Sequence, residues 1–425
     1  MKGALLLCWA LGLAAPALAQ HAHSDHHPPA HDDAPMRDHA AHAAMTGALG
    51  PYPAGREASG TSWQPEAAGH HGAHAAHGDW RFMSHALLNA VYDWQGGPRG
   101  GEKAFVAGMI MGAARRDFDN GGALTLRAML SPDPFMGRSG YPLLLAAGET
   151  ANGVDPLVDR QHPHDLFMEL SASYAQRVDA RSSFFVYAGL PGEPAFGPPA
   201  FMHRPAAIDS PEAPITHHWL DSTHITFGVA TLGYVNGAWK IEGSRFRGRE
   251  PDEERYDIET GALDSTALRL SYNPSPRWAL QLSWADVKSP EQLEPEDDET
   301  RWSASALYSR PLGAGVFSMT AAFARKDGHH GASDAALFEA ALQPDDRWTL
   351  FARGEWIETS ELGAGDGNED VARASLGALH DWRVGDNVRL GVGALYQRAF
   401  VSEALAPSYG GDQDGAMAFV RIRID

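Results

Sequence analysis

Cysteine is almost absent from this chain of 425 residues. Its single cysteine, Cys8, lies in an apolar stretch that ends at Leu18. A basic N-terminus, this stretch and the small-residue motif Ala17-Leu18-Ala19 before Gln20 predict a signal peptide over residues 1–19. We therefore expect a mature chain with no disulfide, no thiol chemistry and no lipid anchor.

Long apolar runs are missing after the signal peptide, and basic residues are in deficit. No later run reaches the roughly 18 apolar residues that a membrane-spanning helix needs, so only a β-barrel could cross a membrane. The chain has 34 basic and 54 acidic residues, a formal charge of −20. An acidic chain is a poor partner for nucleic acid and a plausible partner for cations.

Catalytic motifs are also missing. The sequence has no Gly-x-Ser-x-Gly elbow, no His-Glu-x-x-His helix and no phosphate-binding glycine loop. Ser222, His224 and Asp221 are the residue types of a hydrolase, but groups so close along one segment rarely form a nucleophile, base and orienting acid. We expect no enzyme and assign no catalytic residue.

Hydrophobic residues recur at every second position beyond Trp80, as in Trp278, Leu280, Leu282 and Trp284. A period of two indicates β-strands. The pattern predicts about sixteen strands (about 14 to 18) of the roughly ten residues that a tilted transmembrane strand needs. They begin near Phe82, Lys103, Gly122, Leu166, Ser182, Thr223, Gly237, Leu263, Pro276, Arg301, Ala314, Ser333, Arg347, Val371, Asn387 and Gln413.

Short and long connections alternate between these strands. Short polar turns fall at 178–181, 236–237, 273–277, 310–315, 343–347 and 382–387. Long connections fall at 131–165, 190–222, 248–262, 288–300, 359–370 and 402–412. Alternation of this kind is typical of outer-membrane barrels, with periplasmic turns and extracellular loops. We therefore expect an all-β, transmembrane antiparallel β-barrel over 80–425, in outer-membrane lipid, with both termini periplasmic.

Histidine is concentrated near the N-terminus. Eleven of the 21 histidines lie there: His21, His23, His26, His27, His31, His39, His42, His70, His71, His74 and His77. Imidazole binds Cu(II), Ni(II) and Zn(II), and the surrounding Gly, Ala and Pro predict a disordered periplasmic tail over residues 20–79. We expect loose chelation. Two alternatives are a solvated tail with no metal role and an acid-sensing tether.

Six of the ten remaining histidines lie in or just after the loops at 131–165 and 190–222. The candidate metal ligands are His162, His164 and Asp165 in the first loop and Met202, His203, His217, His218 and His224 in and just after the second. Imidazole, carboxylate and thioether groups from two neighbouring loops would suit copper or zinc. The alternative is that these side chains bond one another and Arg160 or Arg204, and so pin the loops over or inside the lumen.

Charged residues are also predicted on the lumen side of the strands. They are Lys240, Glu242, Arg245, Arg247 and Arg269. They would set the electrostatics of an open pore or form salt bridges within a packed interior, and the sequence leaves both open.

At 159–165, 192–204 and 217–228 the chain resembles an uncharacterised family of bacterial outer-membrane barrels encoded at copper and heavy-metal resistance loci. The resemblance extends over most of 80–425. It implies an envelope location and a metal association, with no ligand set or activity to carry over. The tail is similar in kind to that of the outer-membrane copper-resistance B proteins, whose barrel sequence differs.

The sequence thus predicts an outer-membrane barrel that binds or passes transition-metal ions, copper or zinc, in heavy-metal resistance or homeostasis. The alternative is a general diffusion porin, or a structural barrel, with a metal-buffering tail. Either form is compatible with a homo-oligomer.

Overall fold

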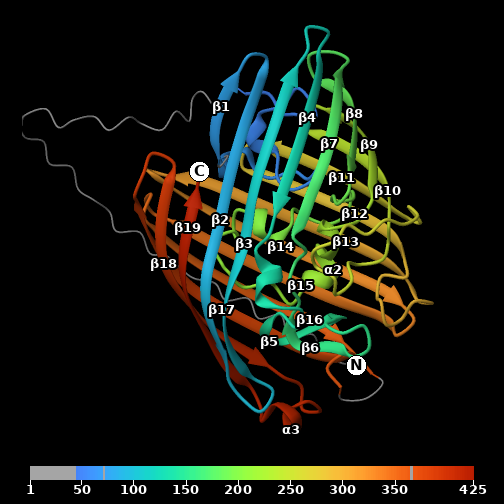
Figure 1. Cartoon of the computed structure of the whole chain (residues 1–425), viewed down its shortest axis with the longest axis vertical. Coiled ribbons are helices and arrows are strands. Elements are labelled where there is room, and N and C mark those ends of the chain that lie inside the picture. The colour runs from blue at the N-terminus through green and yellow to red at the C-terminus, as the bar shows by residue number, and fades with distance from the viewer. Residues whose placement is uncertain (1–44, 70–71, 364–366) are drawn as a thin grey trace, which may run out of the picture. The chain divides into compact units, whose positions relative to one another are not determined.

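A computed structural model describes residues 45–69, 72–363 and 367–425. Among these residues, 17 strands form one antiparallel sheet, and all of them except β1 close into a sixteen-stranded barrel (Figure 1). The barrel strands are β2 (Trp80–Gln95), β3 (Gly101–Asp117), β4 (Gly122–Leu130), β7 (Phe167–Arg177), β8 (Ser182–Gly189), β9 (Val229–Asn236), β10 (Trp239–Phe246), β11 (Ser265–Ser275), β12 (Trp278–Lys288), β13 (Asp298–Leu312), β14 (Gly315–Gly328), β15 (Gly331–Gln343), β16 (Trp348–Thr359), β17 (Glu369–Arg383), β18 (Val388–Phe400) and β19 (Gln413–Ile424). β19 pairs with β2 and closes the barrel.

The predicted barrel of sixteen strands is confirmed. Fifteen strand starts lie within three residues of the predicted ones, the largest difference being Arg301 against Asp298 in β13. The exception is β9, predicted near Thr223 but beginning at Val229. Residues 222–224 form a short 3-10 helix, η5 (Ser222–His224), so the long connection before β9 ends later than predicted.

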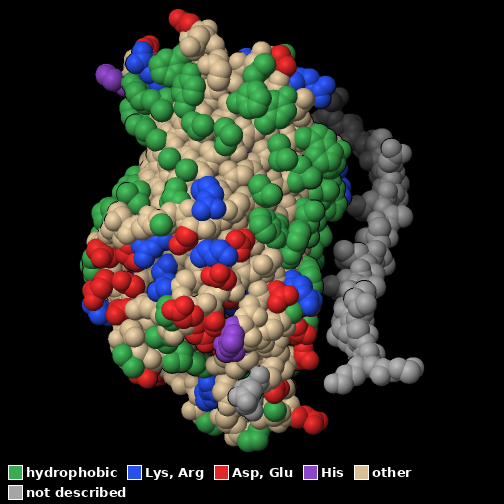
Figure 2. Space-filling view, turned by 90° about the vertical axis from the view of Figure 1, so that its right-hand side faces the viewer, with side chains coloured by type: hydrophobic (Ala, Val, Ile, Leu, Met, Phe, Trp, Pro, Cys, Tyr) green, Lys and Arg blue, Asp and Glu red, His purple; other side chains and the backbone are tan. Residues whose placement is uncertain are grey.

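Side chains alternate between the two faces of the wall. In β10, Lys240 and Glu242 are buried inside the barrel, whereas Trp239 and Ile241 are exposed outside it. Arg245 lies on the outer register of the same strand and is exposed, so its predicted lumen position is wrong by one residue of the two-residue period. Figure 2 shows hydrophobic side chains over the upper part of one face and charged side chains gathered below them.

Aromatic side chains lie on the outer face, near strand ends. Six tryptophans are exposed there: Trp94, Trp239, Trp278, Trp302, Trp348 and Trp382. Exposed tryptophan at the ends of outward-facing strands is what an interface between lipid and water favours.

The two ends of the barrel differ. Turns such as the one between β9 and β10 are short at one end, which we call the short-turn end; the opposite end, which carries the long connections, is the loop end. A further strand, β1 (Ala73–His77), pairs with Trp80–Ser84 of β2. It continues the wall beyond β19, whose pairing with β2 covers Ala86 to Gln95.

Residues 45–69, here called the N-terminal segment, fold inside the short-turn end. The segment includes the 3-10 helices η1 (Ala54–Arg56) and η2 (Glu66–Ala68). The Ala67 backbone N–H donates to the Pro276 carbonyl at 2.8 Å, and Arg56 donates to the Gly237 carbonyl at 2.7 Å, so the segment is bonded to two of the turns.

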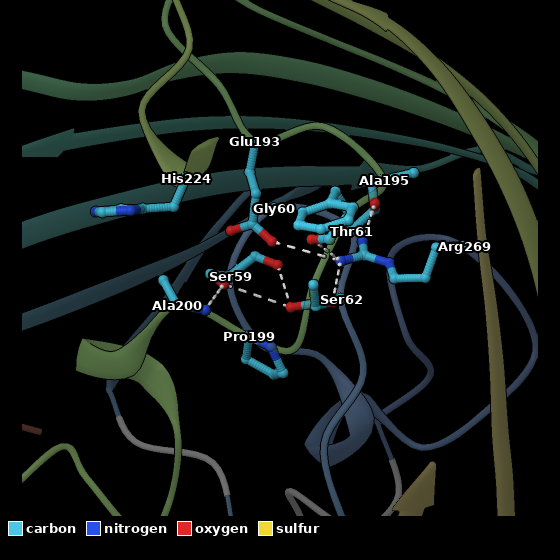
Figure 3. A network of polar contacts seen from close by, with 12 residues as sticks. Ser59, Gly60, Thr61, Ser62, Glu193, Ala195, Pro199, Ala200, His224 and Arg269 are labelled. Atoms are coloured by element: carbon cyan, nitrogen blue, oxygen red, sulfur yellow. Dashed lines mark hydrogen bonds and ion pairs between the residues drawn. The ribbon is translucent and has the colours of Figure 1, made fainter. Parts of the chain in front are cut away.

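Charged and aromatic residues hold this segment. Arg269, 1% exposed, donates to the Thr61 hydroxyl at 2.9 Å, and the Ser59 hydroxyl accepts from the Ala200 backbone N–H at 2.9 Å (Figure 3). Tyr52 and Trp63 form an apolar cluster with wall residues that include Phe185. The segment therefore has a core, half of which is the barrel wall.

The predicted disordered tail over residues 20–79 is wrong for 45–69 and 72–79. Few large apolar residues occur in this stretch, but the barrel supplies their packing partners, which composition cannot reveal. His74 and His77 lie exposed in β1. The other predicted tail ligands, His21, His23, His26, His27, His31, His39, His42, His70 and His71, lie outside the described residues.

Candidate functional site

The connection between β8 and β9, residues 190–228, crosses the barrel interior and is here called the inner loop. Its Asp209 bonds Arg421 of β19, its Thr216 hydroxyl donates to Glu355 of β16 at 2.9 Å, and its Trp219 indole donates to Ser333 of β15 at 3.0 Å. Because β8 and β9 lie on the other side of the barrel, the loop spans the lumen. It contains η4 (Phe201–His203) and α2 (His217–Leu220), and Figure 1 labels α2 within the barrel.

Buried ion pairs fix the inner loop. Arg204, fully buried, donates to Glu339 of β15 at 2.8 Å and to Asp221 at 2.6 Å. On the wall, Lys240 and Arg269 both pair with Glu242, at 2.8 and 2.9 Å. These contacts favour the packed-interior alternative over an open pore for this set of charges.

The connection between β4 and β7 is the second element of the site. It contains η3 (Asp133–Met136) and a hairpin, β5 (Tyr141–Thr150) and β6 (Pro156–Gln161). Leu145, Glu149 and Asp159 in this hairpin adopt positive φ values of 71°, 59° and 56°. Non-glycine residues in this region are strained, and such residues gather at functional sites.

Five buried imidazoles from these two connections meet in the lumen, and we call them the histidine cluster. They are His162, His164, His217, His218 and His224. Ring centroids are 5.2 Å apart for His164 and His224, 5.1 Å for His224 and His217, and 6.2 Å for His217 and His162. His218 stands 5.6 Å from both His162 and His217. His162 and His164 are 6.4 Å apart, so these four rings form a closed group with His218 beside it.

Polar neighbours orient four of these rings through Nδ1. The partners are the carboxylate of Glu149 for His162 at 3.2 Å, Asp133 for His164 at 2.8 Å, Asp221 for His217 at 2.9 Å and the Asp221 carbonyl for His224 at 2.7 Å. The Nε2 atoms of His162, His164 and His224 are buried and have no hydrogen-bond partner among the described residues. An imidazole held at one nitrogen by a carboxylate or carbonyl, with the other nitrogen open, is the usual arrangement of a metal ligand.

Burial favours the neutral form of three of these imidazoles. It lowers the pKa of His162, His218 and His224 well below the ordinary value, and neighbouring imidazolium or guanidinium charge adds to the effect. A neutral ring has a lone pair available for a metal. Burial raises the pKa of Asp221, but Arg204 and His217 outweigh it and hold that pKa below its usual range.

The cluster is wider than an assembled metal site. Zinc-bound nitrogens lie about 2.0–2.1 Å from the metal, which brings ligand atoms much closer together than these ring spacings. Among the described residues, two other groups of three have all ligand atoms within 4.8 Å of one another: His218, Glu250 and Glu291, and Glu294, Asp297 and His330. Binding at the histidine cluster would require its rings to rotate inward.

The other predicted ligands lie outside the cluster. Asp165 pairs with Arg255 at 3.3 Å, Met202 packs against hydrophobic clusters, and His203 lies in a separate cavity of about 70 Å³ with His85 and Met111. Ser222 accepts from Arg301 at 2.9 Å, whereas His224 Nδ1 contacts the Asp221 carbonyl.

The sequence analysis did not identify the carboxylates of the site. Glu149 and Asp133 orient two of the rings, and Glu250 and Glu291 stand beside a third. Their loops are rich in acidic residues, so no spacing distinguished these four from solvent-facing neighbours. Their role depends on the inward fold of the loops, which one sequence does not display.

Comparisons with known proteins give the fold. No protein-family model matches the chain, and no curated protein matches it. OmpF of Salmonella typhi, solved in complex with daunomycin, superposes with a TM-score of 0.53 at 10% identity, over 83% of this chain and 100% of that one. The fold is that of a bacterial outer-membrane β-barrel.

Two further solved structures are similar at lower scores. An anion-selective porin from Comamonas acidovorans has a TM-score of 0.48 at 10% identity over 81% of this chain, and the channel DcaP of Acinetobacter baumannii has 0.44 at 9% over 84%; each is covered in full. Among the described residues, no helix is long and apolar enough to span a membrane.

Proposed function

We propose that the protein is an outer-membrane barrel that binds a transition-metal ion within its lumen. One observation carries this proposal: buried imidazoles held through Nδ1 have Nε2 atoms that find no partner in the described part of the chain. A buried polar atom with no partner is costly, and a metal bound by several such atoms would remove that cost. Imidazole nitrogen suits Cu(II) and Zn(II).

The N-terminal histidines extend this proposal. With both termini in the periplasm, the histidines of residues 21–77 would collect ions at the short-turn end, where His74 and His77 lie exposed. This arrangement would serve heavy-metal resistance or homeostasis. Loss of residues 21–44 should then weaken metal resistance without changing sugar permeability.

A general diffusion porin is the second candidate. The likeness to OmpF favours it more directly than it favours metal binding. Against it stand the inner loop, which crosses the lumen, and wall residues such as Arg421 and Lys240, which have no exposed surface. Water-filled pores leave such side chains solvated.

Metal titration of the full-length protein in detergent micelles tests the proposal. His164→Ala/His224→Ala should lose about one tightly bound Cu(II) or Zn(II), with the remaining ions on the tail unchanged. His329→Ala/His380→Ala is the matched control, because these rings lie outside the cluster. Equal stoichiometry and affinity in both variants would contradict the proposal and favour the porin.

A liposome-swelling assay separates the two candidates independently. A general porin passes small sugars at rates that these histidine substitutions leave unchanged. A plugged barrel gives little swelling with the intact chain, because the inner loop and the N-terminal segment occupy its lumen.

A further inference from the structure

A cavity of about 580 Å³ lies among the long connections at the loop end, and we call it the acidic cavity. Six carboxylate residues line it: Glu149, Glu291, Glu294, Asp297, Glu299 and Glu361. Lys326 is the one lysine or arginine in the lining. A concave surface of one charge sign raises the local concentration of the opposite ion, so this cavity favours cations.

Behind the Glu291 wall of this cavity stand Glu250 and His218. One ligand atom from each of the three residues lies within 4.8 Å of the other two. Glu250 and His218 are each 7% exposed, and neither the two Glu250 oxygens nor His218 Nδ1 has a hydrogen-bond partner in the described chain. The described neighbours of Glu250 are the Ser222 hydroxyl and, at 3.8 Å, Arg301 and His218, so its buried carboxylate is only weakly compensated.

Neighbouring cations compensate Glu250 poorly. Arg301 Nη2 stands 3.8 Å from Glu250 Oε1, beyond hydrogen-bond distance, while its Nε pairs with Glu299 at 2.6 Å and its Nη1 donates to Ser222 at 2.9 Å. Closing the gap to Arg301 would satisfy one oxygen of Glu250. The other oxygen, Oε2, stands 3.8 Å from His218 Nδ1.

Gly148 lines the cavity and lies directly against the His218 ring. A Cβ atom on Gly148 would lie 2.5 Å from Cε1 and 2.8 Å from Nε2 of that ring, and the residue has a φ of +121°. Only glycine permits this approach. The backbone of β5 thus fixes the imidazole beside the two carboxylates.

We infer that His218, Glu250 and Glu291 form a second cation site, the throat site, at the inner end of the acidic cavity. One imidazole nitrogen and two carboxylates suit divalent ions such as Mn(II), Fe(II), Co(II) and Zn(II), and the two carboxylates distinguish the site from the all-nitrogen histidine cluster. Since Mn(II) prefers oxygen ligands and binds imidazole weakly, it reports on the throat site, whereas Cu(II) reports on the cluster.

The position of the throat site suggests a route. Glu294 and Asp297, both half-buried, and the exposed His330 form a second group of three in the lining of the same cavity. His218 belongs to the throat site and also stands 5.6 Å from His162 of the cluster. A divalent cation that enters from the loop end would therefore bind at the throat site before it reaches the histidine cluster. This route rests on the proposed function.

Mn(II) binding to the full-length protein, followed by electron paramagnetic resonance, tests the throat site. Glu291→Gln should weaken the tightest Mn(II) site at least tenfold. Glu361→Gln is the matched control, because it removes the same charge from the same cavity but lies outside the group of three. Equal affinity of both variants and the parent would overturn the inference, as would equal weakening by both.

Two further variants separate failure of the throat site from failure of the histidine cluster. Glu250→Gln should weaken Mn(II) binding as Glu291→Gln does, and if it fails to fold, the half-buried Glu291 still provides the test. His164→Ala/His224→Ala should lose Cu(II) binding but keep the Mn(II) site. If Glu291→Gln loses Mn(II) binding while the double histidine variant keeps its Cu(II) binding, the throat site is supported and metal binding by the histidine cluster is refuted.

Discussion

Two rings of the histidine cluster, His217 and His224, are oriented by one aspartate that is itself anchored. Asp221 contacts His217 through its carboxylate and His224 through its carbonyl, and Arg204 holds the same carboxylate from the other side. A shared partner makes the positions of two rings depend on one aspartate. Substitutions two contacts away from the rings should therefore change their geometry.

Gly148→Ala should disturb the throat site more than the same substitution at another glycine with positive φ. The added Cβ collides with the His218 ring, so we expect Mn(II) affinity to fall at least tenfold in a binding titration. Gly137→Ala is the control. Gly137 has a φ of +89° and no atom within 4 Å of an added Cβ, so its substitution should cost only about 1 kcal/mol of backbone strain.

Arg204→Met should destabilise the barrel strongly. It removes the arginine that pairs with Glu339 and Asp221 in the lumen, and the loss of one partner from a buried ion pair costs about 3–5 kcal/mol. The shift appears as a lower urea midpoint of tryptophan fluorescence in vesicles. Arg398→Met should leave that midpoint unchanged, because the pair with Asp414 is 40% and 45% exposed. Equal shifts would refute the packed interior.

At the scale of elements, the sequence predicted the strands well and the inserted segments poorly. Each strand shows a period of two along its own length, so residues such as Trp278 and Leu280 reveal it locally. The N-terminal segment has no such period. Its Tyr52 and Trp63 pack against Phe185, a contact over more than a hundred residues that local pattern cannot display.

The candidate site was predicted in part for the same reason. The spacing of His162 and His164, and of His217 and His218, marked two loops, and the structure brings these four rings together with His224. The carboxylates came from other positions in the loops. Which acids face inward depends on how the hairpin of β5 and β6 turns back into the barrel.

Deletion of residues 45–69 should open the short-turn end of the lumen. The segment occupies space beside Lys240 and Arg269, and its removal would leave both side chains hydrated. We expect a clear rise in small-sugar flux in a liposome-swelling assay. Deletion of residues 21–44, upstream of the described segment, is the control and should leave the flux unchanged; equal flux in both would mean that the inner loop alone closes the lumen.

At the scale of the whole molecule, two ends with different connections imply a defined orientation. Val154 is 73% exposed between β5 and β6 at the loop end, and Val384 is 56% exposed in the turn between β17 and β18 at the short-turn end. If the loop end is extracellular, a divalent cation meets the acidic cavity before the histidine cluster.

Single cysteines test this orientation, because the predicted mature chain has none. Val154→Cys should react with a membrane-impermeant maleimide on intact cells, and Val384→Cys should react only after the outer membrane is opened. The reverse pattern would place the loop end in the periplasm and would turn the proposed route around.

The first hairpin has a consequence for self-association. β19 covers β2 only from Ala86 to Gln95, and β1 covers the remaining stretch from Trp80 to Ser84. A chain that began at Trp80, the barrel boundary suggested by hydrophobic pattern alone, would display the bare backbone N–H and C=O groups of those five residues. Such an edge recruits strands from other molecules, so that shortened barrel should form dimers or aggregates where the longer chain does not.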